Sequence, residues 1–440
     1  MNLLSSCTKL PVLLLLYTLM TNSSGYAQDS RQEIYANLRK SGGVNFAYPA
    51  PEKIAATPPP AGYEPVYISH FGRHGSRYLV SDEEYKKTLD VFERAGKDKM
   101  LTPLGEDVLA RLRTIYSHVQ GNGGQLTPLG IKQIRDIADR MFQTYPTVFT
   151  GRSTVTAVST TVGRCIKSME LLCDELKQKN PDLSIVTDAH KRHMDYLNYH
   201  TRQAVAFRSA ADTWRPNYEQ FEKEHVNPDR LLSTLFLSSP KWGSDFNPRS
   251  FVFDLFDLAG NLQNTPLAIS LYDLFEKEEL YNLWQCKNYS LYVQYGNAVV
   301  NGGIMMENAK PLLRDIVTRA DSIISAKGKG ASFRFGHDGN IIPLAMLLHI
   351  QGAYNSVADP KDYRLFWNDF KIAPMAANIQ MVFYRHRESN DVLVTYLYNE
   401  QPVSVPPVQT SNFPFYKWSD VRSYYQSLVG QGNNLPSSSR

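Results

Sequence analysis

The stretch from Val66 to Arg77 reads Val-Tyr-Ile-Ser-His-Phe-Gly-Arg-His-Gly-Ser-Arg. Its first half is a short apolar run with β-branched and aromatic members, and Gly72 ends that run. Such a run predicts a buried strand over Val66 to Phe71, followed by a polar loop. In open α/β sheets, ligands bind beyond the carboxyl ends of the strands. The loop is therefore the first candidate for a ligand site.

The loop places His74 between two arginines, Arg73 and Arg77, next to Gly75, which allows close approach of the backbone to a ligand. Guanidinium groups form charge-assisted, often bidentate bonds to phosphate oxygens. A neutral imidazole can attack phosphorus and form a covalent intermediate, and nearby positive charge favours the neutral form. The pattern suits a tetrahedral dianion, although the same four residues could equally form a solvated surface turn.

Elements of two kinds alternate along much of the chain. Helices are expected to begin at Thr102-Pro103 and Thr127-Pro128, because Thr caps a helix and Pro fits its first turn. Strand patterns recur at 153–158, 331–335, 379–384 and 392–398, and helical periodicity at 160–179, 306–325 and 341–350. This alternation predicts an α/β fold with a mixed central sheet flanked by helices.

Between about 191 and 297 the sequence becomes aromatic-rich and amphipathic, with little strand signal. We therefore expect a mostly helical cap over 191–297, inserted into a discontinuous α/β domain of residues 28–190 and 298–440. Residues 28–63 contain three consecutive prolines and are expected to be an irregular lead-in.

The first 27 residues resemble a secretory signal peptide. Lys9 precedes an apolar run from Leu10 to Met20, and Gly25-Tyr26-Ala27 places small residues before a cleavage point. The run is about half of the roughly 20 residues that span a bilayer. We expect an exported chain, periplasmic or secreted, that begins near Gln28 and has no membrane span.

Composition limits the partners. The chain has 440 residues and a net charge of only +4, which gives no reason to expect a nucleic-acid partner. Export would leave Cys165, Cys173 and Cys286 in the mature chain, an odd number that allows at most one disulfide. Buried thiols are the favoured interpretation, and a disulfide stays open.

Several segments together resemble a known family. The segment from Arg73 to Arg77 resembles the Arg-His-Gly-x-Arg motif of the histidine acid phosphatases, branch 2 of the histidine phosphatase superfamily. Tyr78 follows the second arginine, and in this the segment resembles the inositol polyphosphate phosphatase and phytase-like members. Leu79 stands where the family motif usually has proline. Further matches follow in the family's order at 126–130, 159–168, 335–340 and 376–378.

The resemblance implies a role for each site residue. His74 would be the nucleophile and Asp338 the proton donor to the leaving oxygen. The transferring phosphoryl group would be bound by Arg73, Arg77, Arg164 and His337. No metal and no cofactor would be needed. Asp338 could also serve simply as a helix-start residue.

The implied activity is hydrolysis of a small-molecule phosphate monoester, with inositol polyphosphates such as phytate favoured. The element His337-Asp338-Gly339 differs from the His-Ala-Glu element of many inositol-polyphosphate members. A sugar-phosphate phosphatase of the glucose-1-phosphatase type therefore stays open, and a phosphate-binding protein without turnover is the alternative of a different class. A mutase is disfavoured, and the oligomeric state is left open.

Two further groups have competing interpretations. Lys191 and Arg192 could contact a multiply phosphorylated substrate or lie on a solvated face. Trp214, Tyr218 and Trp284 could line a sugar or inositol site, although aromatic residues are more often part of a core.

Overall fold

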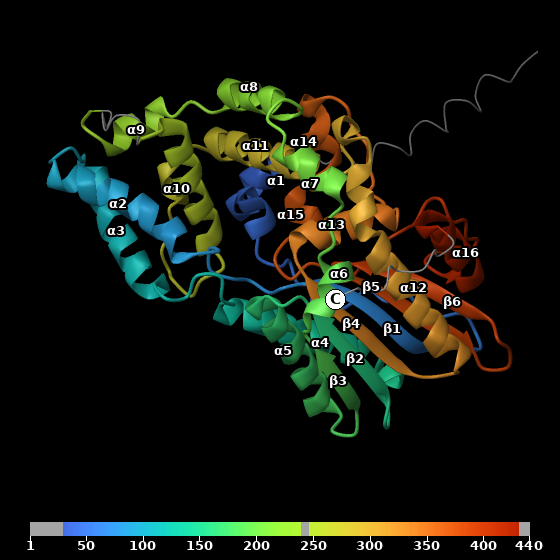
Figure 1. Cartoon of the computed structure of the whole chain (residues 1–440). Coiled ribbons are helices and arrows are strands. Elements are labelled where there is room, and N and C mark those ends of the chain that lie inside the picture. Colours follow the sequence, from blue (N-terminus) through green and yellow to red (C-terminus); the bar gives the residue numbers. More distant parts are fainter. Residues whose placement is uncertain (1–29, 239–245, 431–440) are drawn as a thin grey trace, which may run out of the picture.

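The computed structural model describes residues 30–238 and 246–430, so the expected signal peptide lies outside the described residues. Its centre is an eight-stranded sheet (Figure 1). The strands are β1 (Tyr63–Arg73), β2 (Thr154–Ser159), β3 (Ser184–Asp188), β4 (Gly330–Gly336), β5 (Asn378–His386), β6 (Val392–Tyr398), β7 (Gln401–Pro402) and β8 (Tyr416–Lys417). Their order is β3-β2-β4-β1-β5-β6-β7, and β8 pairs with β6.

The sheet is mixed, and β1 lies where its two halves meet. Strands β3, β2, β4 and β1 run parallel, whereas β1 pairs with β5, and β5 with β6, in antiparallel fashion. From Val66 onward β1 is buried, as expected for a strand that has helices on both faces. The carboxyl end of β1 therefore lies between β4 on one side and β5 on the other.

Helices cover both faces of the sheet. On one face α4 (Pro128–Thr144) and α5 (Gly163–Lys179) form a core with β1, β2 and β4. On the other face lie α12 (Lys310–Ser325), α13 (Asp338–Leu347) and α16 (Trp418–Val429) (Figure 1). This arrangement confirms the expected fold class.

A second, helical region lies beyond the carboxyl ends of the parallel strands (Figure 1). Its members from the middle of the chain are α7 (Arg202–Ser209), α8 (Arg215–His225), α9 (Asp229–Leu235), α10 (Pro248–Leu262) and α11 (Lys277–Tyr295). The short helix α6 (Met194–Leu197) instead packs against α12 and β4. Helices α2 (Asp82–Lys97) and α3 (Pro103–Val119) pack against α10 and α9, and α14 (Tyr363–Phe366) and α15 (Asp369–Ile372) pack against α11. The helical region thus draws on segments outside 191–297, and the domain boundaries stay a prediction.

The helix starts follow the expected chemistry. Thr102 accepts a hydrogen bond from Gly105 N at 3.1 Å, and Thr127 accepts one from Gly130 N at 3.2 Å, with proline at the next position in each case. Each threonine satisfies a backbone N–H that a helix start would otherwise leave unpaired.

The expectation of an irregular lead-in is wrong for residues 30–45. They form α1 (Ser30–Ala36) and the 3-10 helix η1 (Leu38–Asn45), which packs against α10, α11 and α15. Short polar segments carry little periodicity, so tertiary packing rather than propensity stabilises them.

Cys165, Cys173 and Cys286 are buried free thiols. Within residues 30–238 and 246–430, no helix has the length and apolar character needed to cross a membrane.

Candidate active site

The loop after β1 is fixed by backbone hydrogen bonds from both neighbouring strands. Arg73 N donates to Ala377 O at 2.8 Å, and His74 N donates to Gly336 O at 3.1 Å. His74 O in turn accepts from Ala376 N at 3.0 Å. Because the segments on both sides of β1 contribute, His74 is held beyond the carboxyl end of a central strand of the sheet.

The amino end of α4 supports the loop from another side. Thr127 N donates to Ser76 O at 2.9 Å, and Gln133 Oε1 accepts from Ser76 N at 2.9 Å. The approach is so close that a Cβ on Gly75 would lie 2.5 Å from the carbonyl oxygen of Gly130. Glycine at both positions is therefore a packing requirement, which gives the Leu-Thr-x-x-Gly segment a physical role.

His74 presents one defined nitrogen to the site. Its Nδ1 lies 2.9 Å from Gly75 O, and a carbonyl only accepts, so Nδ1 carries the proton and Nε2 keeps its lone pair. The ring is 2% exposed. Burial, together with the charges of the three nearby arginines, holds the pKa of the His74 imidazole well below its ordinary value. The residue is thus a neutral base or nucleophile near neutral pH.

Arg73 is fully enclosed by protein. Its Nη1 donates to Val44 O at 2.6 Å and to Ala373 O at 2.7 Å, and its Nη2 lies 3.1 Å from Asp338 Oδ2. These contacts fix the plane of the guanidinium group. A donor fork that is already oriented costs little reorganisation when it binds an oxyanion.

Each of the three arginines has an N–H donor that makes no hydrogen bond within the described residues. Among the described residues, the buried Nε groups of Arg73, Arg77 and Arg164 have no hydrogen-bond partner. Burial, followed by the charge of Arg73, lowers the pKa of Arg77 to about 10, so the group stays charged at neutral pH. Three cations with unsatisfied donors predict an anion between them.

His337 lies beside His74, with ring centroids 5.7 Å apart. Arg164 Nη2 lies 3.4 Å from His337 Nδ1, and Thr160 Oγ1 lies 3.4 Å from its Nε2. Burial and then the charge of Arg164 lower the pKa of His337 to about 4. The ring is therefore neutral at neutral pH.

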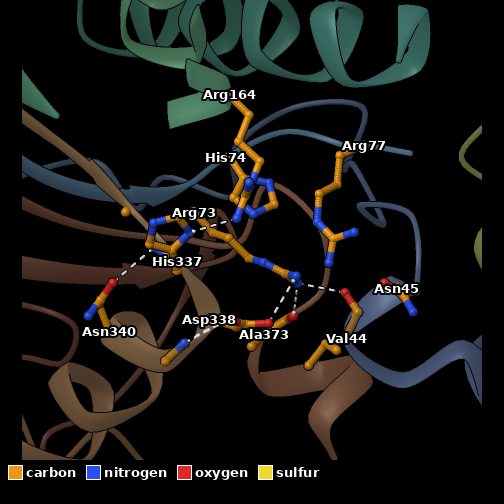
Figure 2. A network of polar contacts seen from close by, with 12 residues as sticks. Val44, Asn45, Arg73, His74, Arg77, Arg164, His337, Asp338, Asn340 and Ala373 are labelled. Carbon is orange, nitrogen blue, oxygen red and sulfur yellow. Dashed lines mark hydrogen bonds and ion pairs between the residues drawn. The ribbon is translucent and has the colours of Figure 1, made fainter. Parts of the chain in front are cut away.

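Asp338 begins α13 and points its carboxylate at Arg73 (Figure 2). Its Oδ1 accepts from Gly339 N at 2.8 Å, so it also has the helix-start role. Burial raises the pKa of this carboxyl, but Arg73 and Arg77 outweigh burial and hold the pKa below its ordinary value. Asp338 is therefore ionised near neutral pH.

All six residues that the sequence singled out gather around one space (Figure 2). They come from β1 and its loop, from α5 and from the start of α13: Arg73, His74, Arg77, Arg164, His337 and Asp338. Within the described ranges, no group of three or more His, Cys, Asp or Glu side chains is arranged to hold a metal ion.

A second set of contacts, which no local sequence pattern predicts, comes from η1, from α10 and from the turn that follows α10. Asn264 Oδ1 accepts from Ser76 Oγ at 2.6 Å, and its Nδ2 donates to Asn45 O at 2.7 Å. Asn261 Nδ2 donates to Arg77 O at 3.1 Å. Both asparagines are 0% exposed. The helical region thus holds the phosphate loop directly, through amides that no local pattern distinguishes.

The other residues that the sequence suggested for substrate contact lie in different environments. Arg192 is exposed and pairs with Asp188. Trp214 and Trp284 belong to the core, whereas Tyr218 lines a cavity beside Arg77.

Comparison with known proteins identifies this arrangement. The family model of the histidine phosphatase superfamily (branch 2) matches residues 71–399, which include all six site residues. The chain belongs to that superfamily. It is a phosphoric monoester hydrolase of the histidine acid phosphatase type.

Relatives of this histidine phosphatase include multiple inositol polyphosphate phosphatase 1 of Gallus gallus, which is 24% identical over 404 residues and covers 85% of this chain and 84% of the relative. The solved multiple inositol polyphosphate phosphatase of Bifidobacterium longum in complex with inositol hexasulfate is 17% identical, with a TM-score of 0.75, covering 88% of this chain and 97% of that one. The phytase from D. castellii is 16% identical, with a TM-score of 0.62 and coverage of 89% and 85%. At these identities the two structures show a shared fold.

Proposed function

We propose that this chain is an exported phosphatase that hydrolyses inositol polyphosphates such as phytate through a phosphohistidine on His74. The observation that carries the proposal is the free lone pair of His74 Nε2 beside three arginines with unsatisfied donors. Nucleophile and oxyanion donors converge on one space, as covalent phosphoryl transfer requires. In the proposal, Arg73, Arg77, Arg164 and His337 bind the phosphoryl group and Asp338 is the acid.

In the first step, Nε2 of His74 forms a bond to phosphorus while the ester P–O bond breaks. The negative charge that leaves with the alkoxide is neutralised by the proton of Asp338. Charge on the equatorial oxygens is stabilised by the arginines, an effect worth about 3 to 4 kcal/mol for one well-placed donor. The proton stays on Nδ1 of His74 and remains hydrogen-bonded to Gly75 O, which keeps the imidazole oriented.

Asp338 must carry a proton to act as the acid, and the neighbouring arginines disfavour its protonated form. In the absence of substrate, Arg73 and Arg77 stabilise the ionised form of Asp338. A phosphate bound to the same arginines would offset their charge and raise the pKa of the carboxyl. The monoanion of a phosphate ester, whose second pKa is about 6, can supply the proton.

In the second step, water attacks the phosphorus atom of phospho-His74. The Asp338 carboxylate takes a proton from that water, the N–P bond breaks, and inorganic phosphate leaves with His74 again neutral. Microscopic reversibility makes one residue the acid of the first step and the base of the second.

Two lines support the substrate class and export. The Gallus gallus relative and the Bifidobacterium longum structure are named as multiple inositol polyphosphate phosphatases. The first 27 residues have the charged, apolar and small-residue regions of a signal peptide. Sequencing the amino terminus of the protein recovered from outside the cytoplasm should give a chain that begins near Gln28.

The decisive variant is His74→Ala. We expect its kcat for phytate and p-nitrophenyl phosphate to fall by about 10⁴-fold or more, because no other group replaces the nucleophile. Rapid acid quench of the parent enzyme should trap an acid-labile phosphoenzyme that the variant lacks. The exposed His190→Ala serves as the control and should keep full activity. Near-normal phosphate release by His74→Ala would contradict the mechanism, and saturable phosphate binding without turnover in the parent protein would favour a binding protein.

A further inference from the structure

A cavity of about 360 Å³ adjoins the phosphate site. Arg77 belongs to both, because its guanidinium group faces the phosphate site and also lines the cavity. The rest of the wall comes from Leu79 and from η1, α2, α8, α10, α11 and α15. Small-molecule sites are typically pockets of about 300 to 1,000 Å³. A substrate with its reacting phosphate on Arg77 therefore has this cavity for the remainder of the molecule.

Carboxylates predominate among the charged groups of the cavity, whereas arginines predominate at the phosphate site. Its lining includes the cations Arg77 and Lys287 and the carboxylates Glu84, Asp257 and Asp369. Lys287 Nζ is already paired with Asp257 Oδ2 at 2.9 Å. Once the reacting phosphate occupies Arg77, the cavity is left with three carboxylates and one lysine.

Glu84 is the carboxylate with the most freedom to act on a ligand. It is half-buried, and within the described part of the chain its carboxylate has no hydrogen-bond or ion-pair partner. Glu84 and Arg77 line the same cavity, and the charge of Glu84 acts to raise the pKa of Arg77. Carboxylates accept hydrogen bonds from hydroxyl groups and repel a second phosphate.

We infer that this cavity binds the free hydroxyl groups of a polyol ring, so that catalytic efficiency increases as the ring carries fewer phosphates. The inference rests on the proposed phosphatase activity and concerns the part of the substrate that is not transferred. Glu84 is the specificity-determining residue, and the uncharged amide of Gln294 in the same wall can also bond to a hydroxyl group. Lower inositol phosphates and hexose monophosphates carry free ring hydroxyl groups, whereas a fully phosphorylated ring has none.

The test compares kcat/KM for four substrates: myo-inositol hexakisphosphate, myo-inositol 1-phosphate, glucose 1-phosphate and p-nitrophenyl phosphate. Both monophosphates should exceed the hexakisphosphate by about tenfold or more, since removal of like charges at short range has effects of this order. The ratio between the inositol and glucose esters distinguishes the two sources of the ring.

Glu84→Gln should raise kcat/KM for the hexakisphosphate about tenfold and lower it for the monophosphates, while p-nitrophenyl phosphate changes little. The matched control is Glu83→Gln, which removes the same charge from the adjacent, exposed position of α2 and should change none of these values. A hexakisphosphate preferred over both monophosphates, with no response to Glu84→Gln, would overturn the inference.

Binding separates this inference from the proposed function. Calorimetry on the His74→Ala chain should show tighter binding of myo-inositol 1-phosphate than of the hexakisphosphate, and Glu84→Gln should reverse or reduce that order. If the order holds but the parent chain releases no phosphate from any ester, the proposed function fails and the cavity assignment stands. If the hexakisphosphate binds more tightly and Glu84→Gln has no effect, the cavity assignment fails even where turnover is observed.

Discussion

The phosphate end of the site and the cavity beside it are built in different ways. At the phosphate end, three arginines surround two neutral histidines, and one carboxylate balances part of their charge. In the cavity, carboxylates outnumber cations, and one of the two cations is shared with the phosphate end. The first region can stabilise a transferring phosphoryl group, and the second can select what that group is attached to.

The two regions also differ in origin. The cationic end depends on a short loop and two helix starts, each recognisable from neighbouring residues. The cavity is assembled from six helical segments that meet only in the folded chain. The contrast suggests that chemistry and substrate choice can be altered separately, and four substitutions test that separation.

The largest effect is expected for Asp338→Asn, which removes the acid but keeps the size of the side chain. Turnover of an alkyl phosphate should fall by about 10² to 10⁴, because an alkoxide leaves poorly without a proton. p-Nitrophenyl phosphate needs no such proton and should lose about tenfold or less. The measurement is kcat for both esters, with the exposed Asp420→Asn as the control. Equal losses for the two esters would show that Asp338 acts on binding rather than on the leaving group.

Arg164→Gln tests the cationic end itself. Loss of one oriented donor should reduce kcat/KM by about 10² to 10³ for every ester, and inorganic phosphate should inhibit the variant more weakly. Arg192→Gln removes an exposed arginine that pairs with Asp188 and should leave both values unchanged. An effect confined to one ester would assign Arg164 to substrate choice instead.

Asp369→Asn tests the cost of a carboxylate in the cavity wall. Burial raises the pKa of Asp369 from 3.8 to about 6, against the hydrogen bond from Trp284 Nε1. The folded state therefore holds the proton more tightly, so the stability contributed by this group is complete below about pH 4 and is lost as the pH rises through 6. The loss is about 3 kcal/mol for a shift of this size.

Asn at this position cannot ionise, so the free energy of unfolding of Asp369→Asn should lack that decrease. Urea unfolding at pH 4 and pH 7, compared between the parent chain and the variant, measures the difference. Parallel pH profiles would mean that Asp369 carries no such charge in the folded chain.

The smallest effect is expected for Asn264→Ala, at the contact between the two regions. Loss of the amide leaves Ser76 Oγ and Asn45 O without their partner, so the loop that carries Arg77 becomes less well oriented. We expect KM and the inhibition constant for phosphate to rise about tenfold, with kcat less affected, in line with one buried hydrogen bond. Ser76→Ala should give a similar change, and the double variant should add little to it. Additive effects would show that the two residues act independently.

Local sequence predicted the elements that local physics specifies. The strand that precedes His74, the threonine caps at Thr102 and Thr127 and the buried core around β1 all follow from neighbouring residue types. The helices within residues 30–45 cannot be predicted in this way, because a short polar segment without periodicity carries no comparable signal. Their contribution, the Val44 carbonyl that fixes Arg73, is a backbone atom that any residue type could supply.

The sequence by itself determined the phosphate loop. Arg73, His74, Gly75 and Arg77 lie within five consecutive positions, so covalent spacing alone places two guanidinium groups beside one imidazole. Only the tertiary structure decided the rest: that His74 keeps its Nε2 lone pair, that Asn264 holds the loop from the turn after α10, and that carboxylates line the cavity. The physical reason is that the charge and hydrogen bonding of a cavity depend on side chains brought together by packing, whose separate positions in the chain carry no sign of one another.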